Sequence, residues 1–209
     1  GVLMLRRRKL AEAMFKAVGL CSLAFAVGTL ALLFGALVVE GLERINWQFL
    51  TSFPSRHAAQ AGILPALVGS TLIMLVTAVV GIPLGVVAAI YLEEYARRTW
   101  LTELIEVTVT NLAGVPSIIF GLLALGLFVY ILGLGASILT AGLTLALLIL
   151  PVVIVTTREA IRAIPVQIRE AAYALGATKW QTVSHHVVPY SAAGILTGVI
   201  LALSRAIGE

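Results

Sequence analysis

Long apolar runs separated by short polar segments dominate this sequence of 209 residues. Several runs hold about 18 residues or more with almost no charge, enough for a helix to cross a hydrocarbon core of about 30 Å. The pattern predicts an all-α fold, a polytopic membrane bundle of helices. We expect five spanning segments, at residues 17–39, 62–92, 113–132, 138–156 and 187–207.

Prolines subdivide these segments. Pro65 lies near the start of the second segment and Pro83 inside it, which predicts an entry turn and a kink. Pro116 and Pro151 lie in the third and fourth segments. Membrane helices tolerate proline because neighbouring groups can satisfy the freed backbone carbonyls.

Composition excludes the ordinary soluble classes. The chain is 60% hydrophobic and 11% charged, whereas a soluble domain is about 25% charged. The net charge of +4 therefore reflects basic loops beside a lipid bilayer, and we expect no nucleic-acid partner. Cys21 is the single cysteine, which excludes an internal disulfide and is typical of a small packing residue in a helix.

Lysine and arginine indicate the orientation. Eleven of them fall on one side of the expected spans, and Arg44 and Arg56 fall on the other. The positive-inside rule then predicts a cytoplasmic N-terminus. We expect residues 1–16 to form a basic cytoplasmic segment and residues 17–209 a single transmembrane domain. The first apolar run is too long for a signal-peptide core, so we expect it to remain as an anchor.

The most informative polar segment is residues 158–189. Ile168, Ala171, Ala172 and Leu175 recur at the spacing of one apolar helical face. Gly176 stands where a helix C-cap belongs.

Thr178 and Gln181 fit a capping box that opens a second helix, and Pro189 leads back into the membrane. Two short amphipathic helices joined at a glycine are therefore expected. Such a pair can lie on the lipid surface, or it can dock into a groove of a cytoplasmic partner.

Charged residues at the end of the last apolar run form a second candidate site. Arg205 and Glu209 are spaced i, i+4, and they continue a face of small residues that includes Gly194, Gly198 and Ala202. We expect this face to point into the protein, because small residues allow close approach of a neighbouring helix.

Two interpretations of Arg205 and Glu209 remain open. They can form an internal ion pair, or they can line the path of an anion. A guanidinium matches the oxygens of a tetrahedral oxyanion, and a carboxylate can accept a hydrogen bond from a protonated phosphate.

Polar residues outside these two candidate sites also allow interpretations. Two interpretations are open for Asn111, Pro116 and Ser117: a polar break that lines the path, or a proline kink with a serine that satisfies the helix. Arg158, Glu159 and Arg162 are expected to brace the loop helices or to lie at the cytoplasmic mouth. A solvated cytoplasmic rim is expected for four acidic residues: Glu93, Glu94, Glu103 and Glu106.

Motifs for enzymatic chemistry are missing from the sequence. It has no G-x-x-x-x-G-K-[ST] loop, so we expect no ATP hydrolysis by this chain and no cofactor bound to it. It also lacks a Ser-His-Asp set, paired carboxylates in a cleft-like context and metal-ligand spacing, so no catalytic or metal residue is assigned.

The loop resembles the EAA loop of ABC importer permeases. Glu170, Ala171, Ala172 and Gly176 match that pattern, with Pro189 thirteen residues after the glycine. The sequence departs from it at His186, where the family has Ile, and at Val188, where it has Leu. The resemblance implies docking to a separate ATPase through a short set of residues: Glu170, Ala171, Ala172, Gly176 and Ala177.

A wider resemblance covers residues 40–209. The stretches "AGILPALVG", "IYLEEYA", "NLAGVPSIIFGLLAL", "TREAIRAIP" and "GILTGVILALSRAIGE" are similar to the PstA-like permease subunits of bacterial phosphate importers. The sister PstC-type subunits share the EAA loop and the terminal R-A-x-G-E pattern. This family implies the type I ABC importer permease fold. Its members usually continue past the glutamate, so we expect a C-terminally truncated chain that lacks a sixth helix.

The resemblance also implies an activity and its partners. The expected activity is ATP-driven import of inorganic phosphate across the bacterial plasma membrane by alternating access, with Arg205 and Glu209 in the substrate pathway. Its expected partners are a second, PstC-like permease chain, two cytoplasmic ATPase subunits that use ATP, and an extracytoplasmic phosphate-binding protein. Alternatives are a permease for another oxyanion or solute, the sister subunit, and a membrane scaffold that transports nothing.

Overall fold

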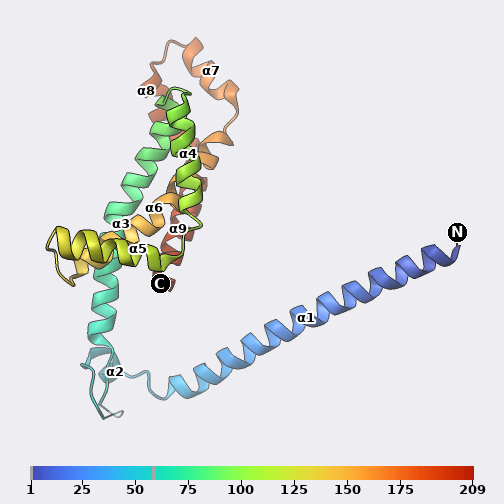
Figure 1. Cartoon of the computed structure of the whole chain (residues 1–209), viewed down its shortest axis with the longest axis vertical. Helices are drawn as coiled ribbons and strands as arrows, with labels where there is room; N and C mark the ends of the chain where they lie inside the picture. Colours follow the sequence, from blue (N-terminus) through green and yellow to red (C-terminus); the bar gives the residue numbers. More distant parts are fainter. Residues whose placement is uncertain (1, 58–59) are drawn as a thin grey trace. The chain divides into compact units, whose positions relative to one another are not determined.

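The computed structural model describes residues 2–57 and 60–209 (Figure 1). Helices make up most of these ranges, and no strand occurs within them. The all-α prediction is therefore confirmed. The chain divides into two compact units, residues 1–65 and 66–209.

The first unit contains one long helix, α1 (Val2–Leu42), and one short helix, α2 (Trp47–Thr51). The basic N-terminal segment and the first apolar run belong to the same unbroken helix, so the expected boundary at residue 16 falls inside α1. Its apolar side chains from Leu10 to Leu42, and Cys21 among them, are exposed. Asn46 begins α2 by accepting a 2.8 Å hydrogen bond from the Phe49 amide.

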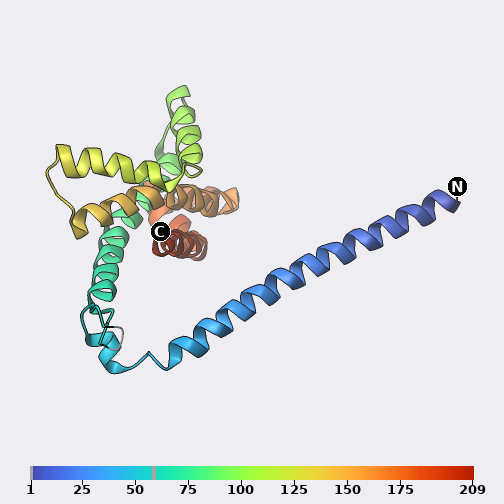
Figure 2. The same ribbon diagram turned by 60° about the horizontal axis from the view of Figure 1, so that its bottom comes forward.

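The second unit is built around α6 (Ile138–Arg162), which carries its longest set of buried residues. Around it lie α3 (Leu64–Ile90), α4 (Trp100–Leu112), α5 (Ser117–Ala124) and α9 (Val188–Gly208), as Figures 1 and 2 show. Ile149 and Val153 of α6 are fully buried at the centre of this packing. The helices of the second unit therefore take their positions from α6.

Small residues bring α3 close to α6. The buried positions of α3 recur every fourth residue: Thr77, Gly81, Gly85 and Ala89. A Cβ at Gly85 would lie 2.6 Å from Val153 Cγ1, so only glycine fits there. Thr77 Oγ1 donates to the Gly142 carbonyl at 3.1 Å, and this hydrogen bond ties the two helices together.

The small-residue face of α9 packs on α6 in the same way. A Cβ at Gly194 would lie 2.7 Å from Ala160 Cβ, and one at Gly198 would lie 2.2 Å from Thr156 Oγ1. Ala202 is fully buried further along this face. The prediction that the face points into the protein is confirmed for Gly198 and Ala202, whereas Gly194 lies against α6 and is exposed.

The third expected span, residues 113–132, differs from a single straight helix. Helix α5 begins at Ser117 and continues as a π-helical segment, η2 (Leu125–Ile131). It is bent by 106° from α4, which precedes it. Pro116 has no N–H group and disfavours a helical residue before it, so the helix breaks there. The described residues contain four helices long and apolar enough to cross a membrane, or five if this bent pair is one span.

The last span also differs from its expected bounds. The second loop helix, α8 (Lys179–Thr182), continues through a π-helical segment, η3 (Val183–Val187), into α9 without a break. Pro189 lies in the first turn of α9, where a missing N–H costs little. The second amphipathic helix is thus the beginning of the final span, and Pro189 does not separate them.

Candidate functional site

The helix α7 (Val166–Ala174) carries the Glu-Ala-Ala sequence and ends in a specific cap. The Gly176 amide donates to the Tyr173 carbonyl at 2.9 Å, and the Ala177 amide donates to the Ala172 carbonyl at 3.1 Å. These two hydrogen bonds define a Schellman motif, which requires a left-handed residue between helix and loop. Gly176 supplies it with φ at +82°. The predicted glycine cap is confirmed.

The next turn begins α8 as the sequence indicates. Thr178 and Gln181 form a reciprocal capping box, with the Thr178 amide donating to Gln181 Oε1 at 2.8 Å. Between the caps, Gly176 and Ala177 reverse the chain, so α7 and α8 lie together at one end of the unit (Figure 1).

The five predicted coupling residues have three different settings. Glu170 and Ala171 are exposed on α7, while Ala172 is buried and Gly176 and Ala177 form the cap. Large apolar side chains beside them are also exposed, above all Leu175 at 90% and Trp180 at 70%. The tip of the loop therefore presents an apolar surface with one acidic group, Glu170.

A cluster of ion pairs that sequence reasoning missed lies beneath this loop. Arg158 of α6 contacts Glu93 of η1 (Tyr91–Tyr95, a π-helical end of α3) through Nε at 3.2 Å. Its Nη2 also forms an ion pair with Glu106 of α4, without hydrogen-bond geometry. The Arg158 side chain is only 6% exposed, so this cluster holds α3, α4 and α6 together in a partly buried setting.

Arg162 and Arg169 extend the cluster. Arg162 Nε donates to Glu93 Oε1 at 2.9 Å, and Arg169 Nη2 donates to Glu94 Oε1 at 2.8 Å. The solvated rim expected of the acidic residues is therefore wrong for Glu93 and Glu94, whose side chains are 16% and 9% exposed. The i, i+4 spacing of Arg158 and Arg162 in an apolar helix is the sequence signal that could have indicated these pairs.

A small cavity lies beside the cluster. It has a volume of 250 Å³, and polar residues of α4 and α6 account for most of its lining: Glu106, Thr110, Asn111, Arg158, Glu159 and Arg162. Arg158 and Arg162 pair with acidic residues of η1, α4 and α6, so the expected bracing of the loop helices by these two arginines is not what the ion pairs show.

Arg205, the first predicted pathway residue, lies half-buried near the end of α9. Its Nη1 donates to the Ala113 carbonyl at 3.2 Å. Ala113 follows α4 at the break before α5. An arginine has five N–H donors, and this is the one hydrogen bond that its side chain makes within the described part of the chain.

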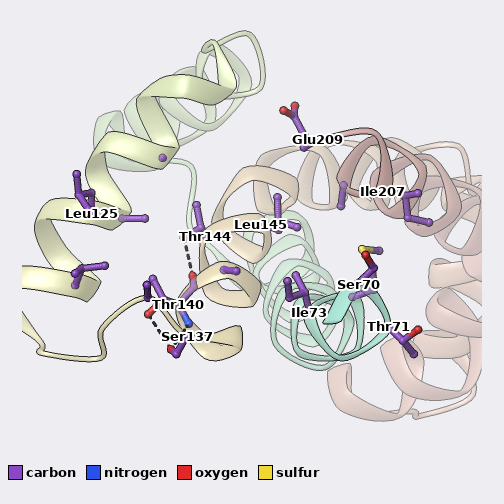
Figure 3. A pocket seen from close by; sticks show the side chains of 17 residues that line it. Ser70, Thr71, Ile73, Leu125, Ser137, Thr140, Thr144, Leu145, Ile207 and Glu209 are labelled. Atoms are coloured by element: carbon purple, nitrogen blue, oxygen red, sulfur yellow. Dashed lines mark hydrogen bonds between the residues drawn. The ribbon is translucent and has the colours of Figure 1, made fainter. Parts of the chain in front are cut away.

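Glu209, the second predicted pathway residue, is exposed and ends the described helix as its C-cap. No ion pair joins it to Arg205 within residues 2–57 and 60–209, so the interpretation as an internal pair gains no support. Glu209 instead borders a cavity of 990 Å³ between α3, α5, η2, α6 and α9 (Figure 3). Arg205 is not part of that lining.

The large cavity is mostly apolar, with a few hydroxyl groups. Thr140 and Thr144 on α6 already donate to backbone carbonyls, Thr140 to Gly135 at 2.8 Å and Thr144 to Thr140 at 2.7 Å. Figure 3 shows the Glu209 carboxylate at the edge, directed away from Ser137 and Thr140. The structure thus does not bring Arg205 and Glu209 together into one closed site.

Comparison with known proteins identifies two matched regions. Residues 81–209 match the family described as binding-protein-dependent transport system inner membrane component. Residues 3–48 match a family described as a domain of unknown function (DUF3333).

Curated relatives cover most of the chain. It is 37% identical over 201 residues to the probable ABC transporter permease protein YqgI of Bacillus subtilis, covering 96% of this chain and 67% of that protein. It is 36% identical over 197 residues to the phosphate transport system permease protein PstA of Yersinia pestis, covering 92% and 65%. With PstA of Mycobacterium leprae it is 41% identical over 148 residues, covering 71% and 48%.

This chain spans between about half and two thirds of the length of these relatives. Its candidate spans and its family make it a multi-pass membrane protein, and the family is a membrane component of transporters, not a hydrolase. From its match over residues 81–209 and its identity with these permeases, the chain belongs to the family of binding-protein-dependent transport system inner membrane components, as a PstA-like ABC permease.

Proposed function

We propose that this chain is the permease subunit of an ATP-driven importer that moves inorganic phosphate across the bacterial plasma membrane by alternating access. The observation that carries the proposal is the similarity to permeases named for phosphate transport, at 36% identity over 92% of this chain for the Yersinia pestis relative. The exposed docking surface and the half-buried arginine described above support the same function.

The coupling step uses the loop between α6 and α9. Glu170 and the exposed apolar side chains of Tyr173, Leu175 and Trp180 dock into a groove of a separate ATPase subunit. The two capped ends keep α7 and α8 in a fixed relation, so a push on the loop moves both together. ATP binds to the ATPase subunit, and this chain holds no cofactor.

Arg205 contributes to the substrate pathway. One guanidinium donor is used by the Ala113 carbonyl, which leaves donors for two oxygens of a passing oxyanion. Glu209, at the rim of the large cavity, accepts a hydrogen bond from a protonated phosphate oxygen. A fully ionised sulfate has no proton to offer, so this carboxylate favours phosphate.

The remaining parts of the importer follow from the same proposal. A second, PstC-like permease chain completes the pathway, two ATPase subunits bind the two coupling loops, and an extracytoplasmic protein delivers phosphate. The N-terminus lies in the cytoplasm, because the basic residues of 1–16 and of the coupling loop then share the side that the positive-inside rule assigns to them.

Uptake by the assembled importer tests this function. The permease chain is reconstituted in vesicles with its partner permease, ATPase and binding protein, and uptake of labelled phosphate and sulfate is followed with ATP supplied on the ATPase side. We expect ATP-dependent phosphate uptake that sulfate does not compete for, and its loss in Glu170→Lys. Transport of another solute instead of phosphate would contradict the proposed substrate. ATP hydrolysis that is equally coupled in Glu170→Lys would contradict the docking role.

A further inference from the structure

Three consecutive residues at the end of α3 each contact a different part of the coupling region. Glu93 pairs with Arg158 and Arg162 of α6. Glu94 pairs with Arg169 of α7. The ring of Tyr95 lies 5.2 Å from Lys179 Nζ of α8.

The π-helical geometry of η1 helps to direct these three side chains. The Ala96 amide donates to the Tyr91 carbonyl at 2.8 Å, which closes one wide turn before the chain leaves the helix. Such π-helical turns recur at functional sites. Here the turn places successive side chains toward three separate elements, so the end of α3 is attached to the whole coupling region.

Arg169 makes the central contact of this arrangement. Its Nε and Nη2 donate to Glu94 Oε1 at 3.0 and 2.8 Å. Its Nη1 donates to the Ile164 carbonyl and its Nη2 to the Ile161 carbonyl, each at 3.1 Å. These carbonyls lie at the end of α6, where helices leave carbonyls without partners. One guanidinium therefore joins α7, the end of α6 and the end of α3.

Helix α7 depends on such contacts for its orientation. It has nine residues, and isolated helices shorter than about 12 residues are marginal in water. Ala172 is its one buried residue, so apolar packing alone fixes it weakly. The Arg169 side chain is 19% exposed and that of Glu94 is 9% exposed, so solvent screens their ion pair little.

We propose that Arg169 and Glu94 are a positioning pair that transmits the displacement of the coupling loop to α3. When α7 is pushed, the pair moves the end of α3 with it, and the span follows as part of one body. This inference rests on the proposed coupling function. The displacement then passes through a contact between two side chains that are 75 positions apart in sequence. This route adds to the direct chain connections of the loop to α6 and α9.

The two members of the pair are not equivalent. Arg169→Gln leaves the Glu94 carboxylate buried without its cation, which is costly. Glu94→Gln leaves Arg169 with two backbone carbonyls and an amide oxygen. We therefore expect Arg169→Gln to impair transmission more than Glu94→Gln. Arg169→Lys keeps a positive charge beside Glu94 and donors for the backbone carbonyls, so it should retain part of the transmission.

The first readout is the amount of phosphate moved for each ATP hydrolysed by the reconstituted importer. In Arg169→Gln this ratio is expected to fall roughly tenfold, as for loss of a strong pairwise coupling, while the ATPase subunit still copurifies and hydrolyses ATP. Glu103→Gln is the matched control, because Glu103 is exposed on α4 and has no ion pair among the described residues. An unchanged ratio in Arg169→Gln would overturn the proposal, as would a loss explained entirely by failed ATPase binding.

The second readout does not depend on the substrate. Spin labels are placed at Gln167 on α7 and at Val87 on α3, both exposed, after Cys21 is replaced by serine. We expect a narrow distance distribution in the parent and in Glu103→Gln, and a broad one in Arg169→Gln. An equally narrow distribution in Arg169→Gln would refute the positioning role, even if the importer carries a solute other than phosphate. If the wild-type importer moves no phosphate but Arg169→Gln still broadens the distance distribution, only the proposed substrate is refuted.

Discussion

Arg205 of α9 donates a hydrogen bond of 3.2 Å to the carbonyl oxygen of Ala113, which lies 92 positions earlier in the chain. Ala113 is the C-cap of α4, and the last carbonyls of a helix lack partners within it. The arginine therefore joins the end of the last span to the break between α4 and α5. A residue assigned to the pathway from its chemistry thus also has a defined structural contact.

This contact predicts a stability effect at Arg205. Arg205→Leu removes the donor and should lower the free energy of unfolding by about 1 kcal/mol, the usual net value of one such hydrogen bond. Arg205→Lys retains a donor and a positive charge, so it should unfold close to the wild type. Thermal unfolding of the purified protein in detergent measures both. Equal midpoints for Arg205→Leu and the wild type would show that the contact contributes nothing.

The ion-pair cluster predicts different costs for two arginines of one helix. Arg158→Gln leaves Glu93 and Glu106 without their most buried cation, and breaking a buried pair costs about 3–5 kcal/mol. Arg162 has a side chain that is 45% exposed, so Arg162→Gln should cost less than about 1 kcal/mol. Denaturant or thermal unfolding of the two variants provides the comparison. Similar losses would contradict the assignment of Arg158 as the centre of the cluster.

Close packing of α6 and α9 predicts that Gly198 tolerates no side chain. In Gly198→Ala the new methyl would meet Thr156 Oγ1 at 2.2 Å and Thr156 Cβ at 2.6 Å, and such overpacking costs about 1–3 kcal/mol. Gly121→Ala is the control, since nothing lies within 4 Å of a Cβ at this position in α5. It should be neutral or slightly stabilising. A Gly198→Ala protein as stable as Gly121→Ala would mean that the helices are further apart than described.

The cap of α7 predicts that a substitution at Gly176 impairs coupling, and Gly133 provides a matched control. Gly176→Ala and Gly133→Ala both place alanine at a left-handed position, with φ of +82° and +65° and no atom within 4 Å. Each should cost about 1 kcal/mol of backbone strain. Gly176 alone lies in the docking loop, so only Gly176→Ala should reduce ATPase stimulation in vesicles. Equal effects of the two variants on stimulation would argue against a role of this cap in coupling.

Local patterns in the sequence were sufficient for part of this architecture. The Gly176 cap and the Thr178–Gln181 capping box depend on residues within one or two turns, and the face of Gly198 and Ala202 follows from helical periodicity. These features require no knowledge of distant partners. For the same reason the all-α fold class, the loop helices and the inward face of α9 could be predicted.

Contacts between distant residues could not be predicted in the same way. Arg158 and Glu93 are 65 positions apart, and Arg169 and Glu94 are 75 apart, so no local pattern pairs them. The expectation of a solvated rim failed because charge alone does not indicate burial. The effect of a proline on its helix could not be predicted either: Pro116 lies at the break between α4 and α5, whereas Pro83 and Pro151 lie inside continuous helices.

The most direct test of the account is ATP-driven uptake of labelled phosphate by the reconstituted importer with Arg205 varied. The wild type and Glu103→Gln, which changes an exposed residue of α4, should accumulate phosphate. Arg205→Lys should lose most of the uptake while keeping its stability and its bound ATPase, because an ammonium group lacks the planar fork of donors that matches two oxygens of an oxyanion. Phosphate uptake by Arg205→Lys at the wild-type rate, or no phosphate uptake by the wild type, would contradict the account.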